Sequence, residues 1–212
     1  MSLEFQNQIS IQPTEESGGG GGGGTPSVGI PREVTAQGVL QIPTDLTSWS
    51  LPKGATSVGA YALNNAFRGC ASLTDVDLSN LISITGNQGL NSAFYGCTNL
   101  TSIDFSNLET ADVDYALYNI CYGCTSLTTV TFPKLKSINA SRVFQTAFQG
   151  CTSLTDVYFP ALTTTSCGSN TSIFMNMLYQ TTATAHFPSN TLNYIPQNDI
   201  SGRVAFDLPA TT

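Results

Sequence analysis

Apolar and polar residues alternate along four short segments of this chain, which recur at a fixed interval of 27 residues. In each segment a leucine is followed by one apolar residue three positions later and by another five positions later. Because successive side chains of a β-strand point to opposite faces, this spacing predicts a strand with its apolar members inside. These positions are Leu73, Val76 and Leu78; Leu100, Ile103 and Phe105; Leu127, Val130 and Phe132; Leu154, Val157 and Phe159.

A phrase of nine residues repeats at the same interval. It spans residues 66–74, 93–101, 120–128 and 147–155, and its cysteines are Cys70, Cys97, Cys124 and Cys151. A period in this range is typical of a solenoid, in which one coil cannot bury its apolar face alone and stacks on its neighbours. The predicted fold is therefore a repeat solenoid whose strands pair into a parallel β-sheet, about 4.8 Å apart.

The repeated phrase also predicts the corner and the interior of each coil. A glycine precedes each repeat cysteine, at a corner that needs unusual backbone dihedrals, namely Gly69, Gly96, Gly123 and Gly150. Phe67, Phe94 and Phe148 are expected to stack inside, and Cys121 takes this place in the third repeat.

Cys121 and Cys124 form a CxxC motif, which could indicate redox or metal chemistry. The chain has one histidine and no second CxxC, so the ligands of a zinc site are incomplete. We interpret both thiols as small buried apolar side chains. The repeat cysteines would point in parallel, so free thiols are expected.

The string from Leu51 to Ala62, followed by the phrase from Ala66 to Thr74, resembles the BspA-like leucine-rich repeat. The resemblance covers about residues 51 to 160, and it implies a leucine-rich-repeat solenoid. The present coils are longer, with extra residues at 79–92, 106–119 and 133–146 that we expect to carry short helical turns. Proteins similar to this family are mostly surface adhesins of bacteria or protists, and similar repeats occur in bacteriophage proteins. The resemblance therefore implies binding without catalysis.

The two ends of the chain differ from the repeats. Residues 1–17 alternate apolar and polar side chains without a signal-peptide pattern, and residues 18–31 begin with seven glycines. We predict a strand-like anchor peptide carried by Leu3, Phe5, Ile9 and Ile11, then a flexible linker. Strand addition to a sheet edge would dock such a peptide on another assembly; a disordered tail is the alternative. Residues 32–188 form the predicted solenoid with degenerate end coils, and residues 189–212 a C-terminal cap.

Charge limits the classes of partner. Charged residues make up 10% of the 212 residues and the net charge is -7, so a basic nucleic-acid surface is not expected. The apolar runs are too short to span a membrane. No cofactor is expected. His186 lies in a degenerate repeat beside Ala185 and Phe187, where a structural role is more plausible than that of a catalytic base.

Outward positions of the predicted strands form two rows across the coils. One row contains Asp75, Ser102, Thr129 and Asp156, and the next contains Asp77, Asp104, Thr131 and Tyr158. The predicted binding face consists of Asp75, Asp77, Asp104, Thr129, Thr131, Asp156 and Tyr158. It suits carbohydrate hydroxyls or a basic partner, with Tyr158 available for stacking on a sugar ring. The alternative is that these residues are simply solvated strand faces.

These features favour a non-catalytic adhesion protein of a bacteriophage virion, such as a head or tail fibre or a decoration protein. Its N-terminal arm would bind a capsid or tail protein, and its solenoid a host-surface protein or glycan. A bacterial cell-surface adhesin and an intracellular protein-interaction scaffold are the alternatives, and a homo-oligomer is compatible with each.

Overall fold

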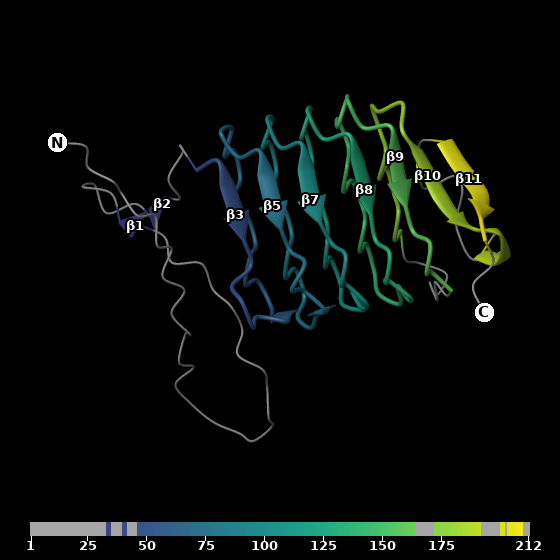
Figure 1. Cartoon of the computed structure of the whole chain (residues 1–212), viewed down its shortest axis with the longest axis horizontal. Helices are drawn as coiled ribbons and strands as arrows, with labels where there is room; N and C mark the ends of the chain where they lie inside the picture. The colour runs from purple at the N-terminus through teal and green to yellow at the C-terminus, as the bar shows by residue number, and fades with distance from the viewer. Residues whose placement is uncertain are drawn as a thin grey trace, which may run out of the picture.

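A computed structural model describes residues 33–34, 40–41, 46–163, 172–191, 200–201 and 203–209 of the chain. Seven strands run side by side in chain order along the solenoid (Figure 1). They are β3 (Ser48–Ser50), β5 (Asp75–Asp77), β7 (Ser102–Asp104), β8 (Thr129–Thr131), β9 (Asp156–Tyr158), β10 (Thr184–Pro188) and β11 (Arg203–Leu208). The predicted solenoid with parallel strands is confirmed.

The strands keep the register that the repeat period predicts. Trp49 pairs with Val76, and Val76 pairs with Ile103, each one period further along the chain. The first coil therefore begins before the clearest repeats, as expected. The strands form two parallel sheets rather than one, in the orders β3-β5-β7 and β11-β10-β9-β8. β7 and β8 are neighbours at the boundary between these sheets.

The coils that begin with β3, β5, β7 and β8 share a second, shorter ladder after their strands. β4 (Ser57–Val58) pairs in parallel with β6 (Ser83–Ile84), and isolated bridges from Ser83 to Thr110 and from Thr110 to Ser137 continue it. Outside the coils, β1 (Glu33–Val34) pairs antiparallel with β2 (Leu40–Gln41).

Stacked rings fill the interior between the coils. Phe67 and Phe94 are almost parallel, with ring centroids 5.3 Å apart, and both are fully buried. Phe132 stacks on Phe159 at 5.2 Å, and Phe144 meets both rings edge-on at 5.1 and 5.3 Å. Burying side chains of this size is the main driving force for stacking one coil on the next.

The segments that connect the short ladder to the next strand are turn ribbons, not the short helical turns that the sequence predicted. In the first ribbon the backbone is left-handed at every fourth residue, at Tyr61 (φ 58°), Asn65 (φ 55°) and Gly69 (φ 75°). Two residues then point inward and two outward in alternation. The same four-residue period occurs at Gln88, Ser92 and Gly96; at Tyr115, Asn119 and Gly123; and at Arg142, Thr146 and Gly150.

Hydrogen bonding explains why the ribbons are not helical. Alternate amides bond within their own turn, as when the Asn64 N–H donates to the Tyr61 carbonyl at 3.1 Å. The amides between them cross to the next coil, as when the Leu63 N–H donates to the Gly89 carbonyl at 2.9 Å. Backbone donors are thus shared between local turns and the stacking of coils, which satisfies them without a helix.

The repeat cysteines are part of this stacking. The five cysteines in the described ranges are free and buried, which confirms the expectation of free thiols for these residues. The thiols of Cys97 and Cys124 donate to the Phe67 and Phe94 carbonyls of the preceding coils, both at 3.1 Å. Cys121 and Cys124 are likewise buried, in agreement with the interpretation of the CxxC motif as core.

The last strands close the C-terminal end of the solenoid. β10 pairs in parallel with β9, and β11 pairs in parallel with β10. The 3-10 helix η1 (Ser189–Thr191) follows β10. Phe187 stacks on Phe159 at 5.0 Å, so the core continues into this end. β11 is thus the last strand of the described residues.

Candidate functional site

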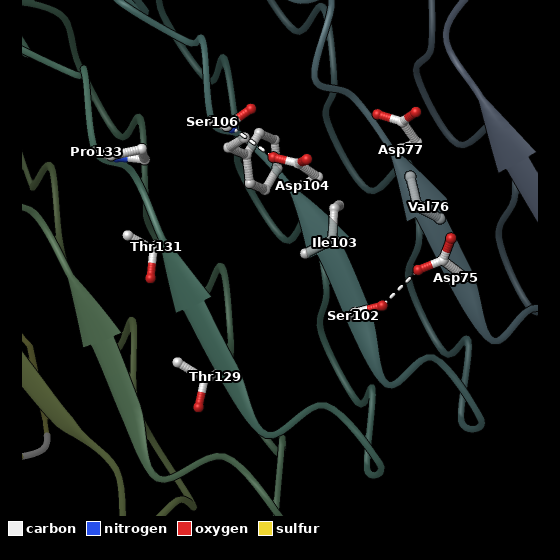
Figure 2. Close-up of a pocket in the computed structure, with 11 residues that line it drawn as sticks. Asp75, Val76, Asp77, Ser102, Ile103, Asp104, Ser106, Thr129, Thr131 and Pro133 are labelled. Atoms are coloured by element: carbon white, nitrogen blue, oxygen red, sulfur yellow. Dashed lines mark hydrogen bonds between the residues drawn. The ribbon is translucent and has the colours of Figure 1, made fainter.

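The outward side chains of β5, β7 and β8 line a shallow hollow on the sheet face (Figure 2). Its volume is about 420 Å³, and it extends across the boundary between the two sheets. Carboxylates line the hollow at Asp75, Asp77 and Asp104, and hydroxyls line it at Ser102, Ser106, Thr129 and Thr131; Val76, Ile103, Phe105 and Pro133 complete the lining.

The hollow follows from strand register and alternation. Asp75 pairs with Ser102 and Asp77 with Asp104, while Val76 and Ile103 between them turn inward. Five of the seven residues of the predicted binding face therefore line one surface, as the two rows imply. Their role in binding stays a prediction.

Two of the carboxylates are held by the same local turn, one coil apart. Asp77 Oδ1 accepts a hydrogen bond from the Ser79 N–H at 2.8 Å, and Asp104 Oδ1 accepts one from the Ser106 N–H at 2.7 Å. Hydrogen bonds from the Ser79 side chain and backbone hold the pKa of Asp77 below its usual value. Both side chains are thereby fixed in orientation.

Asp75 is held by a neighbour in the next coil. The Ser102 hydroxyl donates a hydrogen bond to Asp75 Oδ1, and both residues are exposed. Thr129 and Thr131 are also exposed, so their hydroxyls are accessible from the same side.

The negative charge of the hollow is not neutralised by an ion pair in the described part of the chain. The ion pairs found there join Lys136 to Glu109 and His186 to Asp156 and Asp207. Asp77 and Asp104 occupy directly opposed positions on neighbouring strands, where like charges destabilise a sheet. This arrangement costs stability and leaves a surface rich in hydrogen-bond acceptors.

The two remaining residues of the predicted face, Asp156 and Tyr158, lie on β9 beyond the hollow. Tyr158 stacks on the His186 ring, with centroids 4.5 Å apart and an interplanar angle of 18°. One face of the tyrosine ring is therefore already covered. The predicted stacking of Tyr158 on a sugar is limited to its other face.

His186 has a structural role as a clamp between the last three strands. Its Nε2 lies 2.8 Å from Asp156 Oδ1 on β9, and its Nδ1 lies 2.9 Å from both carboxylate oxygens of Asp207 on β11. Burial alone would lower the pKa of His186, but hydrogen bonds and charges from Asp207 and Asp156 outweigh it and raise the pKa above 6.5. The hydrogen bond from His186 in turn lowers the pKa of Asp156.

Sequence reasoning missed Asp207 as a partner of His186. β10 and β11 pair outside the 27-residue period, so no repeat alignment brings the two residues together. The hydrophobic pattern of β11 was the available signal, because it predicts a strand but gives no register.

Within the ranges given above, no group of three or more His, Cys, Asp or Glu side chains is arranged to hold a metal ion. No helix in the same ranges is long and apolar enough to cross a membrane. The proposed anchor residues Leu3, Phe5, Ile9 and Ile11 lie outside the described residues, as does the linker at 18–31.

A comparison with sequence models of protein families matches residues 41–198 to six copies of the BspA type leucine rich repeat region. The match covers most of the chain. This protein belongs to the BspA-type leucine-rich repeat family. Membership agrees with the strand register and with the repeated phrase described above.

Among solved structures, the chain is similar to a leucine rich cell surface protein from Faecalibacterium prausnitzii A2-165. The two are 20% identical, and the TM-score is 0.42. The similarity covers 82% of this chain and 36% of the other, so this chain spans just over a third of that protein. No curated protein matches the chain.

Proposed function

We propose that this BspA-type repeat protein is a non-catalytic adhesion module, and that the hollow on β5, β7 and β8 binds a glycan on a host surface. The observation that carries the proposal is the set of three carboxylates placed side by side without a neutralising ion pair in the described part of the chain. Like charges at neighbouring positions reduce the stability of the sheet, and a role in ligand binding would explain why they are present.

The chemistry of the hollow favours a ligand that donates hydrogen bonds. Carboxylates only accept hydrogen bonds, whereas serine and threonine hydroxyls both donate and accept. Sugar hydroxyls match this mixture, and hydrogen bonds to charged acceptors are roughly twice as strong as neutral ones. The shallow shape suits an extended chain lying across several coils, since the lining comes from three successive strands.

Binding to an array of neutral and basic glycans tests the proposal. The variant Asp77→Asn/Asp104→Asn keeps the size of both side chains and the oxygens that accept from Ser79 and Ser106. If each charged contact is worth about 1 kcal/mol more than its neutral replacement, affinity falls about thirtyfold. Wild-type affinity in this variant would contradict the proposal.

Glu109→Gln is the matched control. Glu109 is a partly exposed carboxylate away from the hollow, and it pairs with Lys136 at 3.2 Å. Such a surface pair contributes little to stability. We expect this variant to bind like the wild type, because it removes one negative charge without touching the hollow.

A segment of a protein rich in lysine and arginine is the second candidate ligand, favoured by the same uncompensated charge. It predicts binding that falls steeply with salt, since surface charges are screened. No binding on the glycan array, together with binding of an oligolysine peptide that the double variant loses, would favour this ligand over a glycan.

The biological setting is a separate part of the proposal. We assign the module to a bacteriophage virion, where Leu3, Phe5, Ile9 and Ile11 would dock on a capsid or tail protein and the glycines at 18–24 would act as a tether. A bacterial cell-surface adhesin is the alternative, and an intracellular scaffold is the third. Density-gradient fractionation of the source culture separates them, because the chain would band with particles, with cell envelopes or with soluble protein.

A further inference from the structure

The outward side chains of the turn ribbons form a second surface, which we call the ribbon face. The sheet and the ribbons pack on a common core, as the contacts of Phe144 with Phe132 and Phe159 show, so their outward sides point away from each other. The ribbon face is defined by Tyr61, Asn64, Asn65 and Arg68; Gln88, Asn91 and Tyr95; Asp114, Tyr115, Tyr118, Asn119 and Tyr122; Arg142, Gln145, Thr146 and Gln149.

The composition of the ribbon face is unusual for this chain. It contains five of the eight tyrosines and two of the seven basic residues, but only one of the fourteen acidic residues, Asp114. The whole chain carries a net charge of -7, whereas these sixteen positions, with two arginines and one aspartate, carry +1. The ribbon face is therefore opposite in charge to the hollow on the sheet.

One row of the ribbon face is a preformed stack. The Tyr95 and Tyr122 rings are nearly parallel, with centroids 4.6 Å apart and an interplanar angle of 2°. The Arg68 guanidinium lies 3.9 Å from the Tyr95 centroid and donates a hydrogen bond to Asn65 at 3.2 Å. The ring contact and the hydrogen bond hold the Arg68 guanidinium in place at the end of the stacked tyrosines.

A second arginine is held in a similar way in the fourth coil. Arg142 donates a hydrogen bond to the Tyr115 hydroxyl at 2.7 Å, and its guanidinium lies 5.5 Å from that ring. Tyr115 is itself fixed by an edge contact with Tyr118 at 5.5 Å. Holding a guanidinium in place reduces the entropy lost when it binds a planar anion.

The guanidinium groups have donors to spare. A guanidinium carries five N–H donors in a planar fork that matches a carboxylate, and one donor of each arginine makes the contact given above. Asp112 and Asp114 of the third coil accept hydrogen bonds from the next coil, and in the described part of the chain neither forms an ion pair with an arginine. Asp114 accepts from the Ser141 N–H at 2.8 Å, and Asp112 accepts from the Asn139 N–H at 2.7 Å.

The periodic polar surface favours a polysaccharide over a folded protein. Protein interfaces centre on a buried apolar patch, whereas the large apolar side chains exposed in the described ranges are Tyr61, Ile82 and Tyr179. Tyr61 belongs to the ribbon face and ends in a hydroxyl. Amides and hydroxyls recur on each coil, about every 4.8 Å, so a polymer lying along the axis meets similar groups at each step.

We infer that the ribbon face binds a carboxylate-bearing polysaccharide, with Arg68 and Arg142 as the carboxylate contacts and the tyrosines and amides as contacts for hydroxyls. The two arginines are three coils apart, roughly 14 Å along the axis. They stand in different rows, because Arg68 aligns with Tyr95 and Arg142 aligns with Tyr115 at the 27-residue period, so the ligand crosses the ribbon face obliquely and extends over several sugars. This site goes beyond the proposed function, because it uses another side of the coil and the opposite charge.

Biolayer interferometry with immobilised polygalacturonate tests the inference. The same polymer with its carboxylates methyl-esterified serves as the neutral probe. Wild-type protein is expected to bind the acid form, and binding to the ester is expected to be at least tenfold weaker. The variant Arg68→Gln/Arg142→Gln is expected to lose at least tenfold in affinity for the acid form. Lys136→Gln is the matched control, because it removes a positive charge outside the ribbon face.

Each other outcome contradicts the inference. Equal binding of acid and ester forms would exclude carboxylate recognition, and equal losses in the arginine and Lys136 variants would indicate diffuse charge. Binding to polyglutamate but not to polygalacturonate would assign the face to an acidic protein. The variant Asp77→Asn/Asp104→Asn is expected to bind polygalacturonate at least as well as the wild type. This result separates the two proposals, because the variant tests the hollow on the sheet and the arginine variant tests the ribbon face.

Discussion

Replacing Gly86 with alanine tests the close stacking of the first two described coils. A Cβ atom at Gly86 would lie 2.0 Å from the Ala60 backbone nitrogen and 2.6 Å from the Gly59 carbonyl carbon. Both atoms belong to the backbone of the preceding coil, so no side-chain rotation relieves the overlap. The coils must separate locally for the methyl group to fit.

The cost follows from the bonds around this contact. Overpacking of a tight interior typically costs about 1 to 3 kcal/mol. Separation also strains the neighbouring hydrogen bonds between coils, from the Thr85 N–H to the Val58 carbonyl at 2.9 Å and from the Tyr61 N–H to the Asn87 carbonyl at 3.2 Å. Each of these contributes about 1 kcal/mol. We expect Gly86→Ala to lower the free energy of unfolding by about 3 kcal/mol.

Gly123→Ala is the comparison that separates packing from backbone strain. Gly123 has φ 71°, and a Cβ atom there would meet no atom within 4 Å. The cost is therefore that of a left-handed L-residue, about 1 to 2 kcal/mol. Urea unfolding followed by circular dichroism measures both variants. A Gly86→Ala protein within about 0.5 kcal/mol of the wild type, which is the usual range for surface changes, would refute the stacking described here.

Three further results are expected. Leu100→Ala should cost about 2 to 5 kcal/mol of unfolding free energy in urea, because Leu100 is fully buried. The stability of the wild type relative to His186→Gln should increase as the pH falls through the raised pKa of folded His186 and should be complete below 6.5, the pKa of an unfolded histidine. This advantage should persist until Asp156 becomes protonated below pH 3.8. A stability difference that does not change with pH would contradict the clamp. Burial raises the pKa of Cys97, Cys121 and Cys151, so in a Cys167→Ser background these thiols should react with a disulfide reagent only after unfolding.

The strands and their register were predictable because two signals coincide. Val76 and Ile103 lie one period apart, and each stands between polar residues that alternate with it. A strand pattern repeated at a constant interval fixes both the strand and its neighbour. The rows of the hollow, in which Asp77 lies beside Asp104, follow from the same 27-residue spacing.

The turn ribbons could not be predicted in the same way. Helical turns were expected in the extra residues of the coils from strings such as Tyr115-Ala116-Leu117-Tyr118. The left-handed backbone at Asn65 decides the conformation, but a residue other than glycine gives a weak signal for it. Sequence patterns also do not record hydrogen bonds between coils, and these replace the helical bonds.

The hollow was predictable as a set of residues but not as a shape. The boundary between the two sheets, at β7 and β8, interrupts a ladder that the repeats predict to be continuous. The neutralisation of Asp156 by His186 also depends on β11, which lies outside the repeat period. The charge that remains uncompensated in the described part, at Asp75, Asp77 and Asp104, was therefore visible only in the structure.

The most direct test of the adhesion account is to map the bound ligand on the protein. Amide chemical shifts of the isotope-labelled chain would be recorded during titration with the glycan that binds most tightly on the array. The account predicts that the changes concentrate at Asp75–Asp77, Ser102–Asp104 and Thr129–Thr131, and that they disappear in the variant Asp77→Asn/Asp104→Asn. Changes that leave these three strands unaffected and persist in that variant would contradict it.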